Sequence, residues 1–235
     1  MKGIDCLAFG PHPDDVELFC SGVLIKSKKQ GYSTGIVDLT LGELSTNGDT
    51  DTRLKEAERA KKILELDIRL NLGLKDGSID SSWENRQKVI KAIRSLRPKI
   101  CLIPYREDRH PDHESASALL KRALFDSGLS KIDTGQEPYR PNTILYYILH
   151  HFVNPTFVVD ISEQMDQKLE SIKAYESQFS NSTKKGIRTH INDPDFLSSI
   201  ITRAKFLGDR IGVRYGEGFY YPGTMKVDNI INIFS

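Results

Sequence analysis

The chain has few cysteines, little net charge and no long hydrophobic run, and each absence excludes a class of protein. Its 235 residues include three cysteines without CxxC spacing, so we expect buried thiols rather than a disulfide framework or a cysteine zinc site. Lysine and arginine number 33 against 32 acidic residues, with no basic run, so we expect no nucleic-acid partner. No apolar stretch approaches the length of a membrane span, so we expect no membrane association.

The first residues lead directly into the apolar stretch IDCLAF, without the charged start, long apolar segment and cleavage site of a secretory signal. We therefore expect a cytoplasmic protein. No repeat, low-complexity segment or break in composition separates one part of the chain from another. One α/β domain spanning residues 1–235 is the simplest expectation for a chain of this length.

Short apolar runs alternate with segments of helical spacing along most of the chain. Strands are predicted at residues 4–9, 35–41, 68–72 and 99–104, and again in TILYYIL and TFVVDI. Helices are predicted over 16–29, around 54–64 and 89–96, after residue 113, and over 162–178 and 196–210. This alternation predicts a single-domain α/β fold with a Rossmann-like, mostly parallel sheet and flanking helices.

Two loops at predicted strand ends carry the same His-Pro-Asp signature. PHPDD follows the first strand and RHPDH follows the fourth, and parallel sheets place their ligands at such carboxyl ends. His12 and Asp15 are close enough to converge on one ion, and either His110 or His113 can supply a third ligand. Two imidazoles and one carboxylate with an open position indicate a catalytic zinc site, although Fe²⁺, Mn²⁺ and Co²⁺ suit the same donors.

A purely structural explanation competes for either motif taken alone. Pro-Asp-Asp before an apolar helix is also a good N-terminal cap, and acids in the first turn offset the helix dipole. A cap needs no histidine, however, and the second His-Pro-Asp loop repeats the signature at another strand end. The duplication favours the metal site.

Longer stretches around these loops resemble the LmbE-like, or PIG-L, family of zinc deacetylases. The similarity rests on PHPDDVE, LTLGELSTNGDTDTRLKEAERAKKIL and PYREDRHPDHESA, and continues through YYILHHFVNPTFVVDIS, KAYESQF and RIGVRYGEGFYYPG. It implies the LmbE-like deacetylase fold and removal of the acetyl group from an N-acetylglucosaminyl compound. The chain looks like the bacterial branch of N-acetylglucosaminyl-malate deacetylases, which make bacillithiol. Many relatives have alanine where this chain has Pro11.

The resemblance also implies the roles of individual residues. His12, Asp15 and His113 are expected to bind one zinc ion, with Asp14 as the general base. His110 is expected to stabilise the oxyanion, which a protonated imidazole would do best.

Three further residues are candidates beside this set. Asp112 either orients a histidine or only caps the following helix. Relatives lend both Arg53 and Arg109 to the substrate, and a malate aglycone carries two carboxylates that suit guanidinium groups. An exposed ion pair is the alternative for Arg53.

The remaining histidines and the loop after the second strand give weaker signals. His150 and His151 alternate faces, so one of them can point toward the site, although an ordinary strand end is the simpler interpretation. His190 has no partner in the sequence and is expected at the surface. Glu43 and Asn47 fit the rim of a sugar pocket.

Three functions therefore stay open for a small-molecule, amino-sugar substrate. The first is deacetylation of N-acetylglucosaminyl-malate by an enzyme that, like its relatives, is expected to be a homo-oligomer. The second is the same chemistry on N-acetylglucosaminyl-inositol, another N-acetyl amino sugar or a thiol-conjugate amide. The third is a metal-containing sugar-binding protein without turnover, in which Asp14 would be an unneeded acid.

Overall fold

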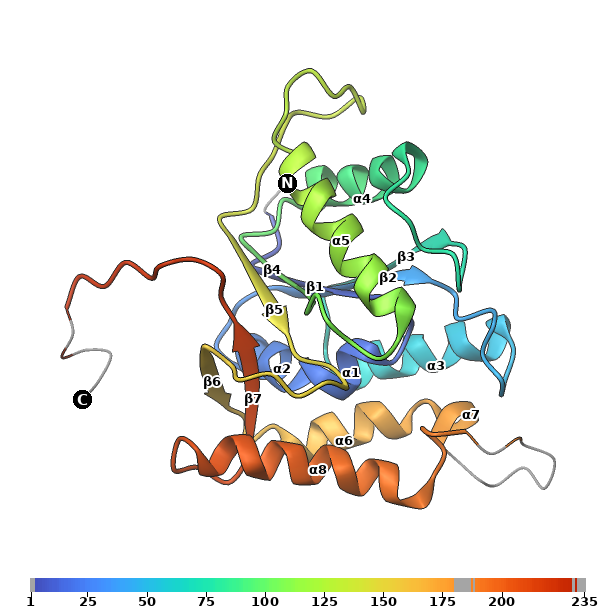
Figure 1. The fold of residues 1–235 in the computed structure, drawn as a ribbon, viewed down its shortest axis with the longest axis vertical. Coiled ribbons are helices and arrows are strands. Elements are labelled where there is room, and N and C mark those ends of the chain that lie inside the picture. Colours follow the sequence, from blue (N-terminus) through green and yellow to red (C-terminus); the bar gives the residue numbers. More distant parts are fainter. Residues whose placement is uncertain (1–2, 180–186, 188, 230, 232–235) are drawn as a thin grey trace.

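The computed structural model describes residues 3–179, 187, 189–229 and 231 (Figure 1). Its centre is a seven-stranded sheet of order β3-β2-β1-β4-β5-β7-β6. The strands are β1 (Cys6–Gly10), β2 (Thr34–Thr40), β3 (Ile68–Leu74), β4 (Ile100–Pro104), β5 (Thr143–Tyr147), β6 (Phe157–Asp160) and β7 (Gly216–Tyr220). Pairing is parallel from β3 to β5, whereas β7 runs antiparallel to both β5 and β6. The predicted α/β fold with a mostly parallel sheet is confirmed.

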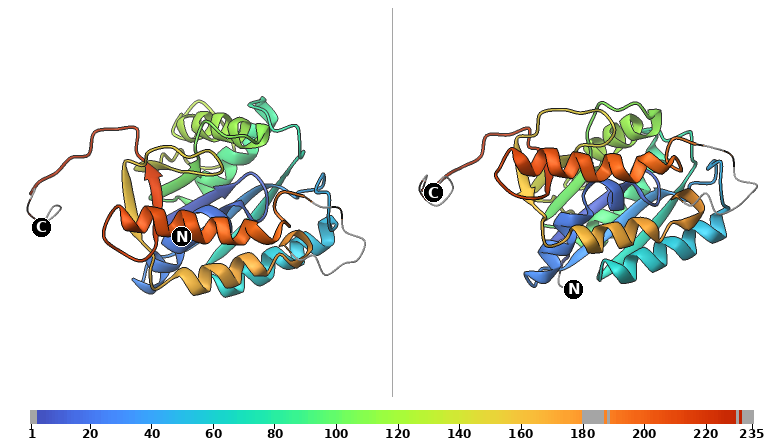
Figure 2. Two further views of the ribbon diagram at one scale, coloured as in Figure 1. Left: turned by 60° about the horizontal axis from the view of Figure 1, so that its bottom comes forward. Right: turned by 90° about the horizontal axis from the view of Figure 1, so that it is seen from below.

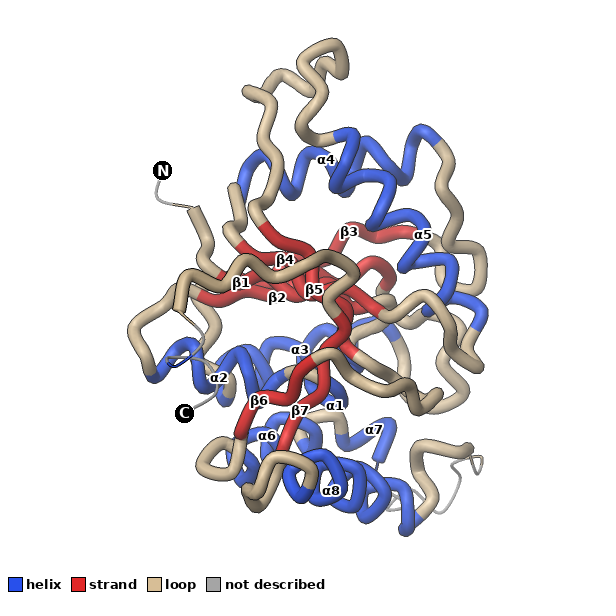
Figure 3. Tube along the Cα trace, turned by 60° about the vertical axis from the view of Figure 1, so that its left-hand side comes forward, coloured by secondary structure: helices blue, strands red, loops and turns tan. Residues whose placement is uncertain are grey.

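Helices cover both faces of this sheet, as the tube drawing shows (Figure 3). On one face lie α4 (Trp83–Leu96) and α5 (Pro111–Asp126), and on the other lie α1 (Asp15–Phe19), α2 (Ser21–Lys29) and α3 (Thr50–Ile63). The C-terminal helices are α6 (Met165–Lys173), α7 (Glu176–Phe179) and α8 (Pro194–Asp209). Helix α6 packs against α1, α2 and α3, and α8 lies beside it against β7 (Figure 2).

Strand β1 shows why both faces need cover. Leu7 and Phe9 belong to the apolar cluster under α4 and α5, while Cys6 and Ala8 belong to the cluster on the opposite face. Successive side chains of a strand point to opposite faces, and here all four are buried. A central parallel strand with no polar face is the expected result. The thiols of all three cysteines are buried, as predicted.

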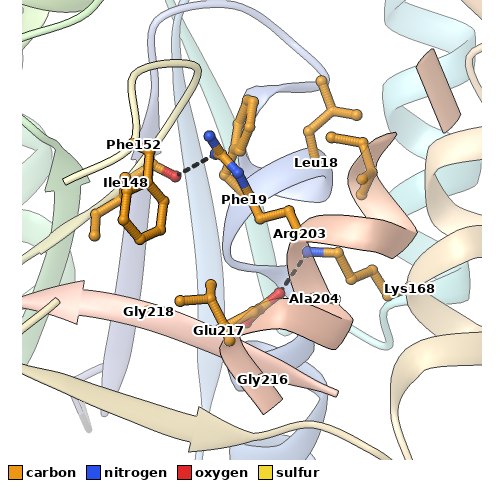
Figure 4. Close-up of a pocket in the computed structure, with 12 residues that line it drawn as sticks. Leu18, Phe19, Ile148, Phe152, Lys168, Arg203, Ala204, Gly216, Glu217 and Gly218 are labelled. Carbon is orange, nitrogen blue, oxygen red and sulfur yellow. Dashed lines mark hydrogen bonds and ion pairs between the residues drawn. The ribbon is translucent and has the colours of Figure 1, made fainter. Parts of the chain in front are cut away.

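The predicted continuous helix over 16–29 is wrong, because the chain breaks between α1 and α2 at Cys20. The Glu217 carboxylate of β7 accepts hydrogen bonds from the backbone N–H groups of Gly22 and Val23 at 2.9 and 2.8 Å. These are free donors at the start of a helix, so the carboxylate stabilises a second helix start at this point. Lys168 of α6 compensates the buried charge of Glu217 at 2.5 Å (Figure 4).

The predicted helix over 162–178 is also shorter than expected, since α6 begins at Met165 and α7 is separate. Ser162 does not cap it, because the Ser162 hydroxyl donates to the Asp160 carboxylate at 2.6 Å. The predicted helix over 196–210 is present as α8.

Strand β7 was not predicted. The two glycines in GEGFY are typical of a loop, which hid the strand in the sequence. Close packing requires glycine here, because a Cβ on Gly216 would lie 2.5 Å from Val158 Cγ1 of β6. Phe219 of the same strand is buried and stacks on Phe157 at a ring distance of 5.6 Å. Beyond β7 the described chain runs away from the body of the molecule (Figure 1). Among the described residues, none of the helices has the length and apolar character needed to cross a membrane.

Candidate active site

The two His-Pro-Asp loops meet because β1 and β4 are direct parallel neighbours. The chain order of the strands reverses direction between these two, and α/β sheets bind ligands in the crevice at such a point. A cavity of about 480 Å³ opens there. Its polar lining includes residues of both loops and of segments that lie between and after them in the chain: His12, Asp14, Asp15, Asn47, Arg53, Asp76, Arg109, His110, His113, His150, Gln178 and His190.

His12, Asp15 and His113 converge at the floor of this cavity. One oxygen of the Asp15 carboxylate lies 3.2 Å from His12 Nδ1 and the other lies 3.3 Å from His113 Nε2. The three side chains expose 12, 5 and 2% of their surface, and their ligand atoms lie within 4.8 Å of one another. This donor set can hold a divalent metal ion.

The titration of these groups reflects their mutual contact. Burial alone would raise the pKa of Asp15, but the charges and hydrogen bonds of His113 and His12 outweigh it and hold that pKa well below its usual range. Burial would lower the pKa of His113, yet Asp15 and Asp108 raise it to about 9. Because metal ligands must be deprotonated, an ion held here would displace protons from these side chains.

The far nitrogen of each histidine faces a further carboxylate. His12 Nε2 lies 3.1 Å from Asp76 and 3.3 Å from Asp112, and His113 Nδ1 lies 3.0 Å from Asp108. Metal-binding histidines commonly donate their other N–H group to a carboxylate, which fixes the tautomer and the ring orientation. The arrangement leaves His12 Nδ1 and His113 Nε2 directed at Asp15, so the residues fit a metal ion on this geometry.

Sequence reasoning left Asp112 either orienting a histidine or capping the following helix, and the structure places its carboxylate beside His12 Nε2 and the backbone N–H of Gly77. It missed Asp76 and Asp108. Asp108 lies in the polar loop directly before α5, five residues from His113, which was a usable signal. Asp76 follows β3, and only its contact with the backbone N–H of Leu44 and with His12 reveals its place in the site.

Asp14 occupies a strained position on the same turn as the metal cluster. Its φ of 127° lies in a region that residues with a side chain rarely adopt, at a cost of about 1–3 kcal/mol. The residue is 6% exposed, and burial raises the pKa of its carboxyl to about 7 although Arg53 opposes the shift. A carboxylate whose pKa lies near neutrality suits a general base.

The two arginines differ in their surroundings. Arg53 is 3% exposed, so the alternative of an exposed ion pair is wrong. Its guanidinium donates to the backbone oxygen of Pro13 at 2.6 Å and lies 3.4 Å from the Asp14 carboxylate. These contacts engage the guanidinium with groups of the protein itself. Arg109 is exposed and lines the cavity. Of these two arginines, only Arg109 offers a guanidinium that no carboxylate in the described part of the chain engages.

His110 is the N-cap residue of α5, and its ring lies against the imidazoles of His12 and His113. Its ring stacks on His113 at 4.7 Å and meets His12 edge-on at 5.0 Å. Burial and the positive charge of the other two histidines lower the pKa of His110, so these surroundings disfavour the protonated imidazole that we expected. His110 Nδ1 accepts the backbone N–H of Asp112 at 3.2 Å, which assigns the ring hydrogen of the neutral form to Nε2.

The remaining histidines and the loop after β2 agree only in part with the sequence predictions. His150 lines the cavity and stacks on His113 at 5.6 Å, whereas His151 is exposed, and neither belongs to a strand because β5 ends at Tyr147. His190 is exposed as predicted, but it also lines the cavity. Asn47 lies on the rim, and the Glu43 carboxylate instead accepts the backbone N–H of Asp76 at 2.8 Å.

Comparison with known proteins agrees with this geometry. Residues 7–124, which include both His-Pro-Asp loops, match the family model described as PIG-L: GlcNAc-PI de-N-acetylase. The chain belongs to the PIG-L family. A diacetylchitobiose deacetylase of Thermococcus kodakarensis is 30% identical over 92% of this chain and 83% of its own length. A probable N-acetyl-alpha-D-glucosaminyl L-malate deacetylase 2 of Bacillus anthracis is 27% identical over 72% of this chain and 79% of its own length.

The fold agrees as well. The crystal structure of the conserved protein TT1542 from Thermus thermophilus superposes with a TM-score of 0.88 at 38% identity, covering 96% of this chain and 98% of that one. The prediction of a PIG-L-type hydrolase that cleaves an N-acetyl amide is confirmed. The two relatives from Thermococcus kodakarensis and Bacillus anthracis are both named as deacetylases of amino-sugar compounds.

Proposed function

We propose that this member of the PIG-L family is a zinc-dependent deacetylase of an N-acetylglucosaminyl conjugate, with N-acetylglucosaminyl-malate of bacillithiol biosynthesis as its substrate. The observation that carries the chemistry is the convergence of His12, Asp15 and His113, with Asp14 on the same turn. The relative named as a malate-conjugate deacetylase supports the substrate. A cytoplasmic location and a homo-oligomer stay predictions.

Diacetylchitobiose is the second candidate substrate. It is favoured by the 30% identical relative named for that activity, which this chain matches over most of its length. A cavity of about 480 Å³ has the size that binding sites for small ligands usually have. Both candidates share the acetamido sugar and differ in what is attached to it.

The attacking water is handled by Asp14. His12, Asp15 and His113 would hold a divalent ion, which would act as a Lewis acid, making water more acidic and polarising the acetamide carbonyl. Asp14 accepts the proton of that water as its oxygen attacks the acetamide carbon. The buried ion pair with Arg53 keeps the Asp14 carboxylate in place and limits the rise of its pKa.

The remaining charge and proton are managed by His110 and again by Asp14. His110 Nε2, which carries the ring hydrogen, donates a hydrogen bond to the oxyanion that develops from the carbonyl oxygen. When the carbon–nitrogen bond breaks, the protonated Asp14 returns its proton to the departing sugar amine. The products are acetate and the free amino sugar conjugate, so water supplies the only atoms added.

The test is acetate release by the zinc-loaded protein and by an Asp14→Asn variant. Asparagine has the same shape as aspartate and tolerates positive φ, so the turn is expected to persist. Loss of the base is expected to lower kcat by about 10²–10⁴-fold. Asp51→Asn on the exposed surface of α3 is the matched control and should keep wild-type kcat. Wild-type kcat in Asp14→Asn would contradict the mechanism.

The same assay compares N-acetylglucosaminyl-malate with diacetylchitobiose and N-acetylglucosaminyl-inositol. A large preference in kcat/KM for the malate conjugate is the expected result. Preference for diacetylchitobiose would keep the chemistry and replace the substrate. No acetate from any of the three would favour a sugar-binding protein without turnover.

A further inference from the structure

A second, smaller cavity of about 260 Å³ adjoins the active site. It is lined by Phe19, Arg109, His150, His190, Phe196, Ser199, Ile200 and Arg203. Arg109, His150 and His190 line both cavities, so the two adjoin along these side chains. We call the smaller cavity the side chamber. At about 30 Å³ for each water molecule in the liquid, it has room for roughly nine waters, and therefore for a substituent of several heavy atoms.

The side chamber is lined by two arginines, Arg109 and Arg203, and by no acidic residue of the described part of the chain. Its lining also includes two histidines, whereas the main cavity is lined by Asp14, Asp15 and Asp76. Neither Arg109 nor Arg203 forms an ion pair with a carboxylate of a described residue. A partly buried guanidinium is normally paired with an acid, whereas the partly buried Arg203 is bonded to neutral backbone oxygens, so its positive charge is left for a ligand to neutralise.

Arg203 of α8 is held in place by backbone oxygens. Its guanidinium donates to the carbonyl oxygens of Ile148, Leu149 and His150, the last at 2.9 Å. Figure 4 shows the side chain reaching past Phe19 toward the loop that carries Ile148 and Phe152. The contact fixes the loop that brings His150 against His113, and it also fixes the guanidinium as a permanent part of the chamber wall.

The apolar side chains of the side chamber increase the attraction of its arginines for an anion. Phe19 and Phe196 are buried, and their rings contact the imidazoles of His150 and His190 at 5.2 and 5.3 Å. The Arg203 guanidinium lies over the Phe19 ring at 5.5 Å. A charge beside such walls is screened less than a charge in water, so its attraction for an anion is larger.

We propose that the side chamber is a subsite for an anionic group, a carboxylate in the first place, carried by the part of the substrate attached to the acetamido sugar. This inference rests on the proposed function, because the sugar must occupy the main cavity for its substituent to reach the chamber. Arg109 at the shared wall and Arg203 deeper in the chamber are the specificity-determining cations. An acidic conjugate is then preferred over a neutral conjugate of the same shape.

The experiment uses the zinc-loaded full chain and two substrates, N-acetylglucosaminyl-malate and its dimethyl ester, which keeps the shape and removes the charge. The variant is Ser199→Asp, which adds an acid to the chamber at an exposed position of α8. Ser199→Asn is the neutral control of the same size. Thr202→Asp adds the same charge to an exposed position of α8 that does not line the chamber.

Wild-type protein is expected to favour the acid over the ester in KM. Ser199→Asp should raise KM for the acid about tenfold and leave kcat/KM for the ester within twofold, with a smaller effect at high salt. Both controls should keep the wild-type preference. An unchanged acid preference in Ser199→Asp, or an equal loss on both substrates, would overturn the side-chamber subsite alone. Failure to deacetylate either conjugate would overturn the proposed function and this inference with it.

Discussion

Asp108→Asn tests whether the carboxylates behind the histidines build the metal site. The Asp108 side chain is 0% exposed. One oxygen accepts from His113 Nδ1 and from the backbone N–H of His110, both at 3.0 Å. The other accepts from the backbone N–H groups of His150 and His151 at 2.8 and 3.3 Å. One buried carboxylate therefore joins a metal ligand to two loops.

An asparagine amide cannot serve these donors equally. Its oxygen can accept where one carboxylate oxygen did, but its NH₂ group faces the remaining N–H groups and leaves buried donors unpaired. Each such loss costs about 1–3 kcal/mol, which corresponds to a fall in Tm of roughly 2–12 °C for a chain of this size. His113 also loses the charged partner that orients its ring, and loss of such a partner lowers metal affinity by about 10–100-fold.

The assay is competition for Zn²⁺ between the protein and a fluorescent chelator, which reports metal affinity without requiring turnover. Asp108→Asn is compared with wild type and with Asp133→Asn, an exposed aspartate far from the site that serves as the matched control. We expect the dissociation constant to rise about 10–100-fold, or about 1.4–2.7 kcal/mol, in the first variant only. A folded Asp108→Asn protein whose affinity stays within twofold of wild type would refute this account of the site.

Two further predictions concern stability away from the metal cluster. Lys168→Met leaves the buried Glu217 carboxylate without its partner and is expected to cost about 3–5 kcal/mol in urea unfolding, with part of the loss recovered in a Lys168→Met, Glu217→Gln double variant. A double variant no more stable than Lys168→Met would contradict the pairing. The Lys99 ammonium and the Ser33 donors hold the pKa of Asp5 below its usual range, so the stability that Asp5 contributes is present above its unfolded pKa of about 3.9 and is lost as the pH falls further. The difference in urea midpoint between wild type and Asp5→Asn should therefore be constant from pH 7 to 5 and shrink toward pH 3, and a difference that grows on acidification would count against this assignment.

The part of the site that the sequence predicts is the part that depends on neighbours in the chain. Strand ends and spacing were enough to name His12 and Asp15 and to offer His110 or His113 as a third ligand. The resemblance to the family added the role of Asp14 and separated the roles of the two histidines. The meeting of these residues follows from the parallel pairing of β1 with β4. The alternation of strands and helices predicts a parallel sheet, but it does not specify which strands are neighbours.

The part that was missed depends on tertiary contacts. Asp76 lies 64 residues from His12 in the chain. In the sequence it is one aspartate in a polar loop after β3, which is typical of an ordinary turn residue. Arg53 was expected to meet substrate or solvent, but the fold buries it against Asp14. Sequence spacing carries no information on either contact, because each is set by how α3 and β3 pack beside the first loop.

The largest error of prediction, the unseen strand β7, also bears on substrate selection. Gly216 and Gly218 conceal the strand because glycine weakens a strand pattern, yet without β7 the sheet would end at β5. Helix α8 packs on β7 and carries both Ser199 and Arg203 to the side chamber. The parallel half of the sheet thus supplies the groups that do chemistry and Arg109, while the antiparallel half positions Arg203, the second cation that we propose selects the substrate. Relatives that share both His-Pro-Asp loops can therefore differ in substrate through changes in α8 alone, without altering the catalytic residues.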